Sequence, residues 1–568
     1  MERKEFLTSL FKPSALKKAK RQAGKPTEED AFVFTGGIAT YTGSWTDKEV
    51  MRLLKRTTFG APVEEIEYFK TLTISDAVDM LVNTIASPSA LGEPVKMYTP
   101  DATTPSSDPD LSVPAGSTWV RTPTYLSAIN RQRRESIKTW WLNNMINQPR
   151  SIEEKMILFW STHLTIEFSS VGGAVISYQY LQLLRKYALG NFKVFIKEIT
   201  LNPAMLIYLN GYVNNKTAPD ENYGRELQEL FTVGKGPDSH YTEDDVKAAA
   251  RVLTGYGADI DYGVYNFNIN KHDTNPKQFS AFYDNTVISR SPAEAQLEVD
   301  DLINMIFSKE EVSKNICRRL YRYFVYHDIT AETEAAIITP LAQTFRDNNY
   351  EIKPVLLQLL KSEHFFDVLQ YGGTIKSGVD FAVGLVRECG IKLPPKSNPL
   401  LLHKHLNYFV TTFLANAEQN IGDPPNVSGF PAYYQTPFFG ELWINTDSYT
   451  RRKSLTGLLA NDGYSNGGFK MSINAIAVAS RMSNPADPDA LVLDFNKYFL
   501  GRELSAGLRN TIKTDILLTG LSDNNYWTAA WNAYINNPAD LNNFSVVNLR
   551  LRSLLQYFLS ILEEYHLE

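Results

Sequence analysis

Apolar residues recur at helical spacing through most of this chain, and residues 218–255 show the pattern most clearly. At 3.6 residues per turn, Tyr223, Leu227, Leu230 and Phe231 fall on one face of the first helix in this stretch. A polar turn separates that helix from a second one. A chain with this periodicity buries its core between helices, which constrains it to a helical fold.

The periodicity begins near Trp45 and is interrupted by three segments. Residues 85–123 are rich in Pro, Ser, Thr and Gly, which predicts a long loop or a mobile insertion. Residues 256–288 lose the helical period and predict either a β-hairpin or an irregular loop. Residues 420–449, here called the aromatic loop, are rich in prolines and aromatic rings. We therefore predict an all-α fold, a large multi-helical bundle with long irregular loops and at most minor β-hairpins.

A chain of 568 residues exceeds one typical core. We divide it into a basic, partly disordered N-terminal tail (1–44), a main helical domain (45–390) and a C-terminal helical region (391–568) packed on that domain. The tail has a second interpretation. Apolar residues in segment 6–11 cluster on one face beside lysines, as in a short amphipathic anchor.

Composition excludes several classes of protein. The net charge is −6, so no global basic field points to nucleic acid. The two cysteines, Cys317 and Cys389, cannot build a disulfide framework. No apolar run approaches the length of a transmembrane segment. The sequence also contains no motif for binding NAD, FAD or ATP. The apolar part of an export leader is missing after Arg3, so we expect a cytoplasmic protein, with periplasm or envelope as the alternative.

A charged stripe lies beside the buried face of the first helix. It contains Asn222, Arg225, Glu226 and Glu229 at spacings i, i+3, i+4 and i+7. Glu226 and Glu229 can approach one point, where two carboxylates repel unless a cation, a proton or Arg225 compensates. The stripe predicts either a metal or acid/base site, or a structural ion-pair network.

Two further groups of residues carry histidine. His163 lies on an otherwise apolar helix face, where it is either a ligand or a core residue with both nitrogens satisfied. His272 and Asp273 precede Lys277 in a polar segment. They either take part in metal binding or proton transfer, with Lys277 holding an anionic group, or form a turn.

The aromatic loop contains Asn426 and Trp443 among prolines and aromatic rings. Its rings either stack on a sugar or another planar ligand, or close the core as a lid. The sequence alone leaves both interpretations open.

Five segments in this order resemble the motifs of a large bacterial family, domain of unknown function 1800. They are RLLKRTTFGAP from Arg52, LFWSTHL from Leu158, DENYGRELQELFTVG from Asp220 with YTEDDVKAAARVLTGYG after it, HDTNPK from His272, and DPPNVSGFP with WINT around the aromatic loop. Residues 220–234 are here called the signature segment. The family pattern has a further histidine where this chain has Ser161.

The resemblance implies a helical protein of uncharacterised activity. Many relatives resemble secreted or envelope proteins and are encoded beside members of domain of unknown function 1501, which implies a partner from that family. Our leading hypothesis is acid/base or metal-assisted catalysis by a site of Arg225, Glu226, Glu229, His272, Asp273 and Lys277, with Asn222 in its wall. His163, Glu226 and Glu229 are the candidate ligands of a divalent metal. The rival is a non-catalytic binding or assembly protein in which the same residues form a structural network.

Overall fold

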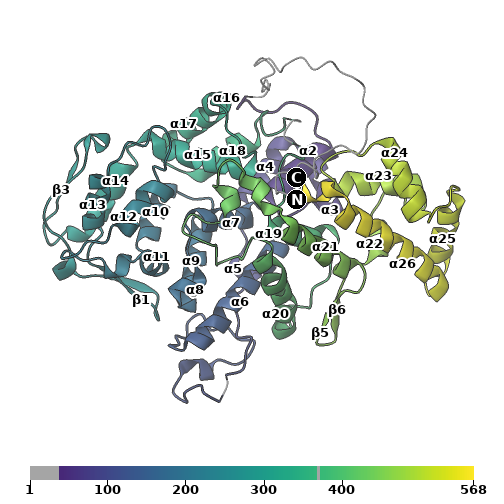
Figure 1. The fold of residues 1–568 in the computed structure, drawn as a ribbon, viewed down its shortest axis with the longest axis horizontal. Helices are drawn as coiled ribbons and strands as arrows, with labels where there is room; N and C mark the ends of the chain where they lie inside the picture. The colour runs from purple at the N-terminus through teal and green to yellow at the C-terminus, as the bar shows by residue number, and fades with distance from the viewer. Residues whose placement is uncertain (1–36, 101, 368–370) are drawn as a thin grey trace.

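A computed structural model describes residues 37–100, 102–367 and 371–568. Most of the expected N-terminal tail therefore lies outside the described residues. The molecule is elongated in Figure 1, with helices α10 to α14 at one end and α22 to α26 at the other. Helices α2, α7, α15 and α19 lie between these two ends. Within the described part, no helix has both the length and the apolar character needed to cross a membrane.

The all-α prediction is confirmed. Regular structure is mainly helical, and the strands of the described residues form three two-stranded antiparallel sheets. The segment 256–288, which predicted a hairpin or a loop, contains two of them. Strands β1 (Tyr256–Asp259) and β2 (Val264–Phe267) pair, as do β3 (Lys277–Gln278) and β4 (Val287–Ile288). The third sheet joins β5 (Tyr464–Asn466) to β6 (Phe469–Met471).

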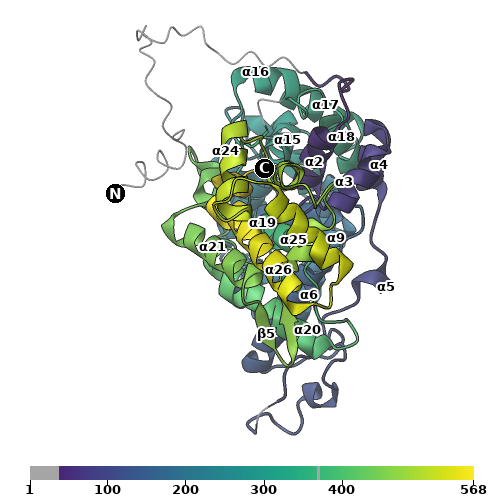
Figure 2. The ribbon, with the colours of Figure 1, turned by 90° about the vertical axis from the view of Figure 1, so that its right-hand side faces the viewer.

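Side-chain caps set the starts of two early helices of the described residues. Thr46 and Glu49 form a capping box at the start of α2 (Asp47–Thr57). Thr73 separates α3 (Val63–Lys70) from α4 (Ile74–Asn83), because its side chain caps the second of these helices. Figure 2 shows α4 beside α18, which is much later in the chain, and Arg56 of α2 donates to the carbonyl oxygen of Phe324 at the end of α15.

The segment 85–123 contains little regular structure, but it is anchored by a buried ion cluster. Lys96 Nζ lies 2.9 Å and Arg133 Nη2 lies 2.7 Å from the carboxylate of Asp110. The Arg133 side chain is 0% exposed, because it binds the loop. Helices of this part of the chain are α5 (Pro88–Leu91), α6 (Ser127–Ile146), α7 (Glu153–His163), α8 (Phe168–Val171), α9 (Ala174–Lys186), α10 (Phe192–Thr200) and α11 (Pro203–Tyr208).

The signature segment is helical but not uniformly α-helical. Asp220 caps α12 (Glu221–Glu226), which continues as a π-helical turn over Leu227–Phe231. Thr242 and Asp245 form a capping box at the start of α13 (Glu243–Val252), which packs against α12. The π turn shifts every later side chain relative to the regular 3.6-residue repeat, so sequence spacing alone misplaces Glu229.

One hydrophobic cluster runs through the described residues from Val50 to Tyr565. An ion pair of 2.7 Å between Arg56 and Glu568 joins the two ends of this region. The proposed boundary at residue 390 stays a prediction. The remaining helices are α14 (Glu298–Ile306), α15 (Glu310–Phe324), α16 (Ala331–Thr333), α17 (Thr339–Asp347), α18 (Ile352–Leu360), α19 (Gly378–Glu388), α20 (Pro399–Asn407), α21 (Thr446–Ala460), α22 (Ala475–Ala479), α23 (Pro488–Phe499), α24 (Ala506–Thr511), α25 (Asn525–Asn536) and α26 (Leu541–Gln556).

Candidate functional site

The end of α7 is a meeting point of separate family motifs. His163 Nε2 lies 3.0 Å from the carbonyl oxygen of Phe231 in the signature segment. Because a carbonyl only accepts, this nitrogen carries the proton. Gly429 of the aromatic loop reaches the same helix end with a φ of +87°. A Cβ atom there would lie 2.5 Å from the Thr162 carbonyl oxygen, so the close approach requires glycine.

The signature segment presents backbone carbonyls to this region. Its helical turn ends at Phe231, and the last carbonyls of a helix lack partners within the helix. Side chains of α15 supply two of the missing donors. Arg319 Nη2 donates to Leu230 at 3.3 Å, and Asn315 Nδ2 donates to Thr232 at 2.8 Å. The signature segment therefore positions His163 and Arg319 through its backbone.

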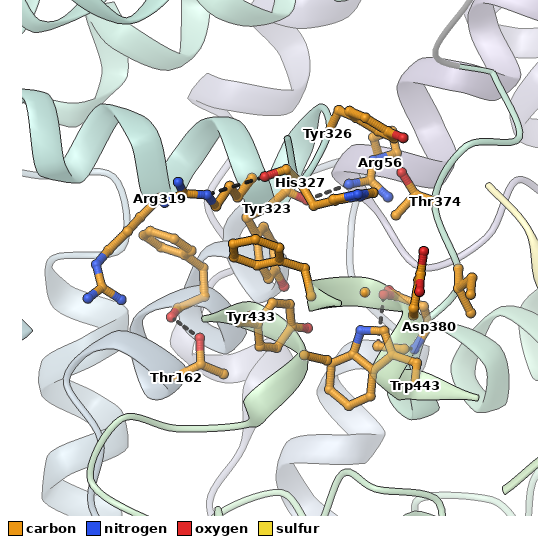
Figure 3. Close-up of a pocket in the computed structure, with 18 of the residues that line it drawn as sticks. Arg56, Thr162, Arg319, Tyr323, Tyr326, His327, Thr374, Asp380, Tyr433 and Trp443 are labelled. Atoms are coloured by element: carbon orange, nitrogen blue, oxygen red, sulfur yellow. Dashed lines mark hydrogen bonds between the residues drawn. The ribbon is translucent and has the colours of Figure 1, made fainter. Parts of the chain in front are cut away.

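A cavity of about 400 Å³ opens between α7, α15 and the aromatic loop. Figure 3 shows Arg319 at one end of this cavity, Asp380 at the other, and Tyr433 between them. Its volume lies within the usual range of small-molecule sites. The lining residues are Arg56 of α2; Lys155, Phe159, Thr162 and His163 of α7; Arg319, Arg322, Tyr323, Tyr326 and His327 in or after α15; residues 372–375 and 377; Asp380 of α19; Ser428, Ala432, Tyr433, Phe439, Gly440, Glu441 and Trp443 of the aromatic loop; and Leu567.

Two cations of the lining are neutralised by carboxylates. Arg56 pairs with Glu568, and Lys155 pairs with Asp380. Burial opposes ionisation of Asp380, but Lys155 and a hydrogen bond from Ser377 outweigh it and leave the pKa of this carboxyl below its usual value. Asp380 is therefore an ionised partner of Lys155 and not a proton donor at neutral pH.

Two other cations of the lining have no carboxylate partner within the described residues. Arg319 and Arg322 are neighbours, one turn apart, on α15. Each donates one hydrogen bond, to the carbonyl oxygens of Leu230 and His327 respectively. Arg318 on the same helix shows the contrast, because its guanidinium binds both Glu311 and Glu334.

Two histidines of the cavity are neutral at pH 7. Burial, and then the charge of Arg319, hold the pKa of His163 well below 6.5. Burial also lowers the pKa of His327, whose ring lies between Tyr326 and Phe439. His163 Nδ1 is buried and has no hydrogen-bond partner among the described residues. A neutral imidazole with a free nitrogen can accept a proton.

Acidification is expected to destabilise the wild-type protein more than a His163→Asn variant. The folded imidazole stays neutral at a pH where the unfolded one takes up a proton. The stability that neutral His163 contributes is fully present above about pH 6.5. At lower pH this contribution decreases, by up to about 1.4 kcal/mol per pH unit, until the pH reaches the pKa of the folded state. Urea unfolding between about pH 7.5 and 5.5 measures this slope. Parallel pH profiles for the two proteins would contradict it.

The charged stripe of the signature segment has its own partners. Arg225 pairs with Glu221 and Glu243, and Glu229 pairs with Lys235. Burial, and then the charge of Glu229, raise the pKa of Glu226. One buried oxygen of Glu226 has no hydrogen-bond partner within the described chain. Asn222 Nδ2 donates to the Leu209 carbonyl at 3.3 Å.

His272, Asp273 and Lys277 belong to a separate network. His272 Nε2 lies 3.2 Å from Glu298 Oε2, and Lys277 pairs with the same carboxylate. The other histidine nitrogen donates to the Thr254 carbonyl at 2.9 Å. Asp273 binds Arg251 at 2.6 Å and accepts from the backbone of Asn275, as expected for a turn. None of the hydrogen bonds and ion pairs in the described structure links this network to Glu226, Glu229 or His163.

No group of three or more His, Cys, Asp or Glu side chains in the described residues is arranged to hold a metal ion. Within the described residues, His163, Glu226 and Glu229 are therefore not brought together as such a group, and a metal at these residues stays a prediction. The π turn redirects Glu229 toward Lys235, while His163 Nε2 is occupied by the Phe231 carbonyl.

The two residues proposed in the aromatic loop differ in position. Trp443 is buried, lines the cavity and packs edge-on against Tyr433 with centroids 5.1 Å apart. Asn426 forms a turn, because its side chain accepts from Ser428 N at 2.9 Å and donates to the Tyr434 hydroxyl at 2.8 Å.

Sequence reasoning missed Arg319, Arg322, His327, Asp380 and Tyr433. A signal for the two arginines was present. They are spaced i, i+3 beside the apolar face of α15, as a stripe of charge flanking a buried face. The others come from segments whose meeting depends on the tertiary fold.

A family model with the description "Protein of unknown function (DUF1800)" matches residues 52–541. The match spans all five motifs and most of the residues that line the cavity. Neither the curated proteins nor the solved structures include a significant match to this chain. Because the matched region covers far more than half of its length, this chain belongs to the DUF1800 family of proteins of unknown function.

Proposed function

We propose that this protein binds a small organic molecule in the cavity between α7, α15 and the aromatic loop. The observation that carries the proposal is the convergence of separate motifs on one cavity. Arg56 comes from the first motif, His163 from the second, and Trp443 from the last. The signature segment contributes through the Leu230 and Phe231 carbonyls that position Arg319 and His163.

Acid/base chemistry at this cavity is supported by His327 and His163, which are neutral imidazoles at pH 7. For the residues that the sequence singled out we propose supporting roles. The ion pair of Arg225 with Glu243 and that of Glu229 with Lys235 hold the signature segment in place. The network of His272, Lys277 and Glu298, with the turn at Asp273, fixes the neighbouring hairpin region to α14.

Filling the cavity is expected to weaken the binding of a cavity-sized dye. Phenylnaphthylamine is an uncharged fluorophore, with a naphthalene and a phenyl group, that brightens in apolar sites. A Cβ atom on Gly440 would meet open space at the cavity lining, so Gly440→Phe adds a ring there without a backbone clash. We expect the dye to bind about tenfold or more weakly to this variant, measured by fluorescence titration.

Gly507→Phe is the matched control, because Gly507 also faces open space but lies on α24, away from the cavity lining. Ala432→Leu adds bulk at a buried position of the same cavity. Unchanged dye affinity in both cavity variants, with folding verified by circular dichroism, would refute a ligand site here.

A second candidate function is non-catalytic assembly with a partner at the cell envelope, for which a domain of unknown function 1501 protein is our candidate. The exposed hairpin β1–β2 favours it. Ile260 is 42% exposed, Tyr262 61% and Val264 55%, and clustered apolar side chains of this kind mark protein contacts. Gel filtration of the two mixed proteins tests it, and separate elution at micromolar concentration would count against it.

A further inference from the structure

We propose that the ligand of this cavity is a ring-bearing anion whose negative group is bound by Arg319 and Arg322. This inference rests on the proposed function and adds the chemical class of the ligand to it. Its evidence is the hydrogen-bonding state of the two guanidinium groups, the balance of charge in the lining, and the placement of the aromatic rings.

The two guanidinium groups have unused donors that face a cavity. A guanidinium has five N–H donors. Arg319 and Arg322 each use one of them on a backbone carbonyl, and neither has a carboxylate partner in the described part of the chain. Arg319 Nε is buried and lacks any acceptor there. A carboxylate or phosphate would fill these donors with charge-assisted hydrogen bonds.

Partial burial of both arginines makes their unpaired charges costly without an anion. Burial lowers the pKa of Arg319 to about 10, and it also lowers the pKa of Arg322, yet both side chains remain charged at pH 7. A buried charge without a partner destabilises a fold unless something compensates it. Arg318, one residue away, has two carboxylate partners, so this helix accommodates ion pairs where the fold supplies them.

The remaining charges of the lining leave the arginine end positive. Lys155 neutralises Asp380, and Glu568 neutralises Arg56. Glu441 is the acid of the lining that has no ion-pair partner among the described residues. Two unpaired arginines against one unpaired glutamate give a net positive lining, which attracts an anion and repels a cation.

Aromatic rings lie next to the positive end. The Arg322 guanidinium carbon lies 5.2 Å from the centroid of the Phe439 ring. The centroid of the His327 ring lies 5.9 Å from the same point. Tyr433 and Trp443 extend the aromatic lining away from the arginines. A ligand with one planar ring and one anionic group could place the anionic group at the arginines and the ring against the aromatic side chains.

The test compares two dyes with the same ring system. Anilinonaphthalene sulfonate carries one negative charge, and phenylnaphthylamine carries none. We expect the wild-type protein to bind the sulfonate about tenfold or more tightly than the neutral dye. We expect Arg319→Met and Arg322→Met to remove this preference while leaving the affinity for the neutral dye within about twofold. Arg451→Met is the control, because Arg451 pairs with Asp447 on an exposed face of α21.

Displacement of the bound sulfonate then identifies the anionic group. Benzoate and phenyl phosphate are expected to compete, and neutral benzamide is not. Stronger competition by one of the two anions assigns a carboxylate or a phosphate ligand.

Equal wild-type affinity for the charged and the neutral dye would overturn this inference, even if both arginine variants failed to fold. In that case a loss of both dyes on Gly440→Phe would still support the proposed function. If Gly440→Phe and Ala432→Leu altered neither dye, the cavity would not be the binding site and both proposals would fall.

Discussion

Replacing Lys277 by methionine is expected to lower the free energy of unfolding by about 3–5 kcal/mol. Lys277 and Glu298 are both 0% exposed, and they form an ion pair that His272 completes. Methionine removes the lysine charge and leaves the Glu298 carboxylate buried with His272 and the backbone N–H of Arg290 as its partners. A buried charge that has lost its counter-charge is strongly destabilising. Urea denaturation at pH 7, followed by circular dichroism, gives the difference directly.

Lys247→Met is the matched control, because Lys247 pairs with Asp244 at the surface, where an ion pair contributes little to stability. The comparison also separates a structural role from a catalytic one. A network that holds the fold predicts lost stability with normal dye binding in the protein that remains folded. Wild-type stability of the Lys277 variant would contradict the supporting role proposed for this network.

Local features of the fold were predictable from the sequence because they depend on neighbours in the chain. The capping box at Thr46 and the break at Thr73 follow from side chains that bind backbone N–H groups two or three residues away. The loss of helical period after Tyr256 marked the β-hairpins for the same reason. Each of these signals is contained in a few consecutive residues.

The site was less accessible to sequence reasoning, because its chemistry depends on residues far apart in the chain. Glu226 and Glu229 have helical spacing, but the π turn at Leu227–Phe231 changes their relative direction. His163 was identified, whereas its partner proved to be the Phe231 carbonyl and not a carboxylate. Every residue has a backbone carbonyl that can accept a hydrogen bond. The amino-acid sequence therefore contains no motif that predicts this contact.

The family motifs gain a physical interpretation from these contacts. The glycine of the aromatic loop, Gly429, allows the backbone to approach Thr162. Gly234 at the end of the signature segment has a φ of +82°, and a Cβ atom there would lie 2.7 Å from the Asn315 side chain that binds the Thr232 carbonyl. Both glycines bring backbone against α7 or α15, so the motifs specify how segments meet around the cavity.

Asp110→Asn is expected to destabilise the protein by about 3–5 kcal/mol and to make residues 85–123 sensitive to protease. The Asp110 side chain is 0% exposed and lies between Lys96 and Arg133. Asparagine is nearly isosteric but uncharged, so two buried cations would remain without their shared counter-charge. The hydroxyl of Tyr98 also donates to this carboxylate at 2.6 Å and would lose a charged acceptor.

Glu93→Gln is the control within the same segment. Glu93 pairs with Arg121 at 2.6 Å, but Arg121 is 74% exposed, so the change should cost less than about 1 kcal/mol. Thermal unfolding and limited trypsin digestion measure both variants. Equal stability and equal digestion of the two would mean that the segment is held by other contacts and not by its buried charge. One such contact is the buried Trp119, whose indole N–H donates to Ser136 of α6. We expect the larger loss of stability for the Asp110 variant, because only that substitution leaves buried charges without a counter-charge.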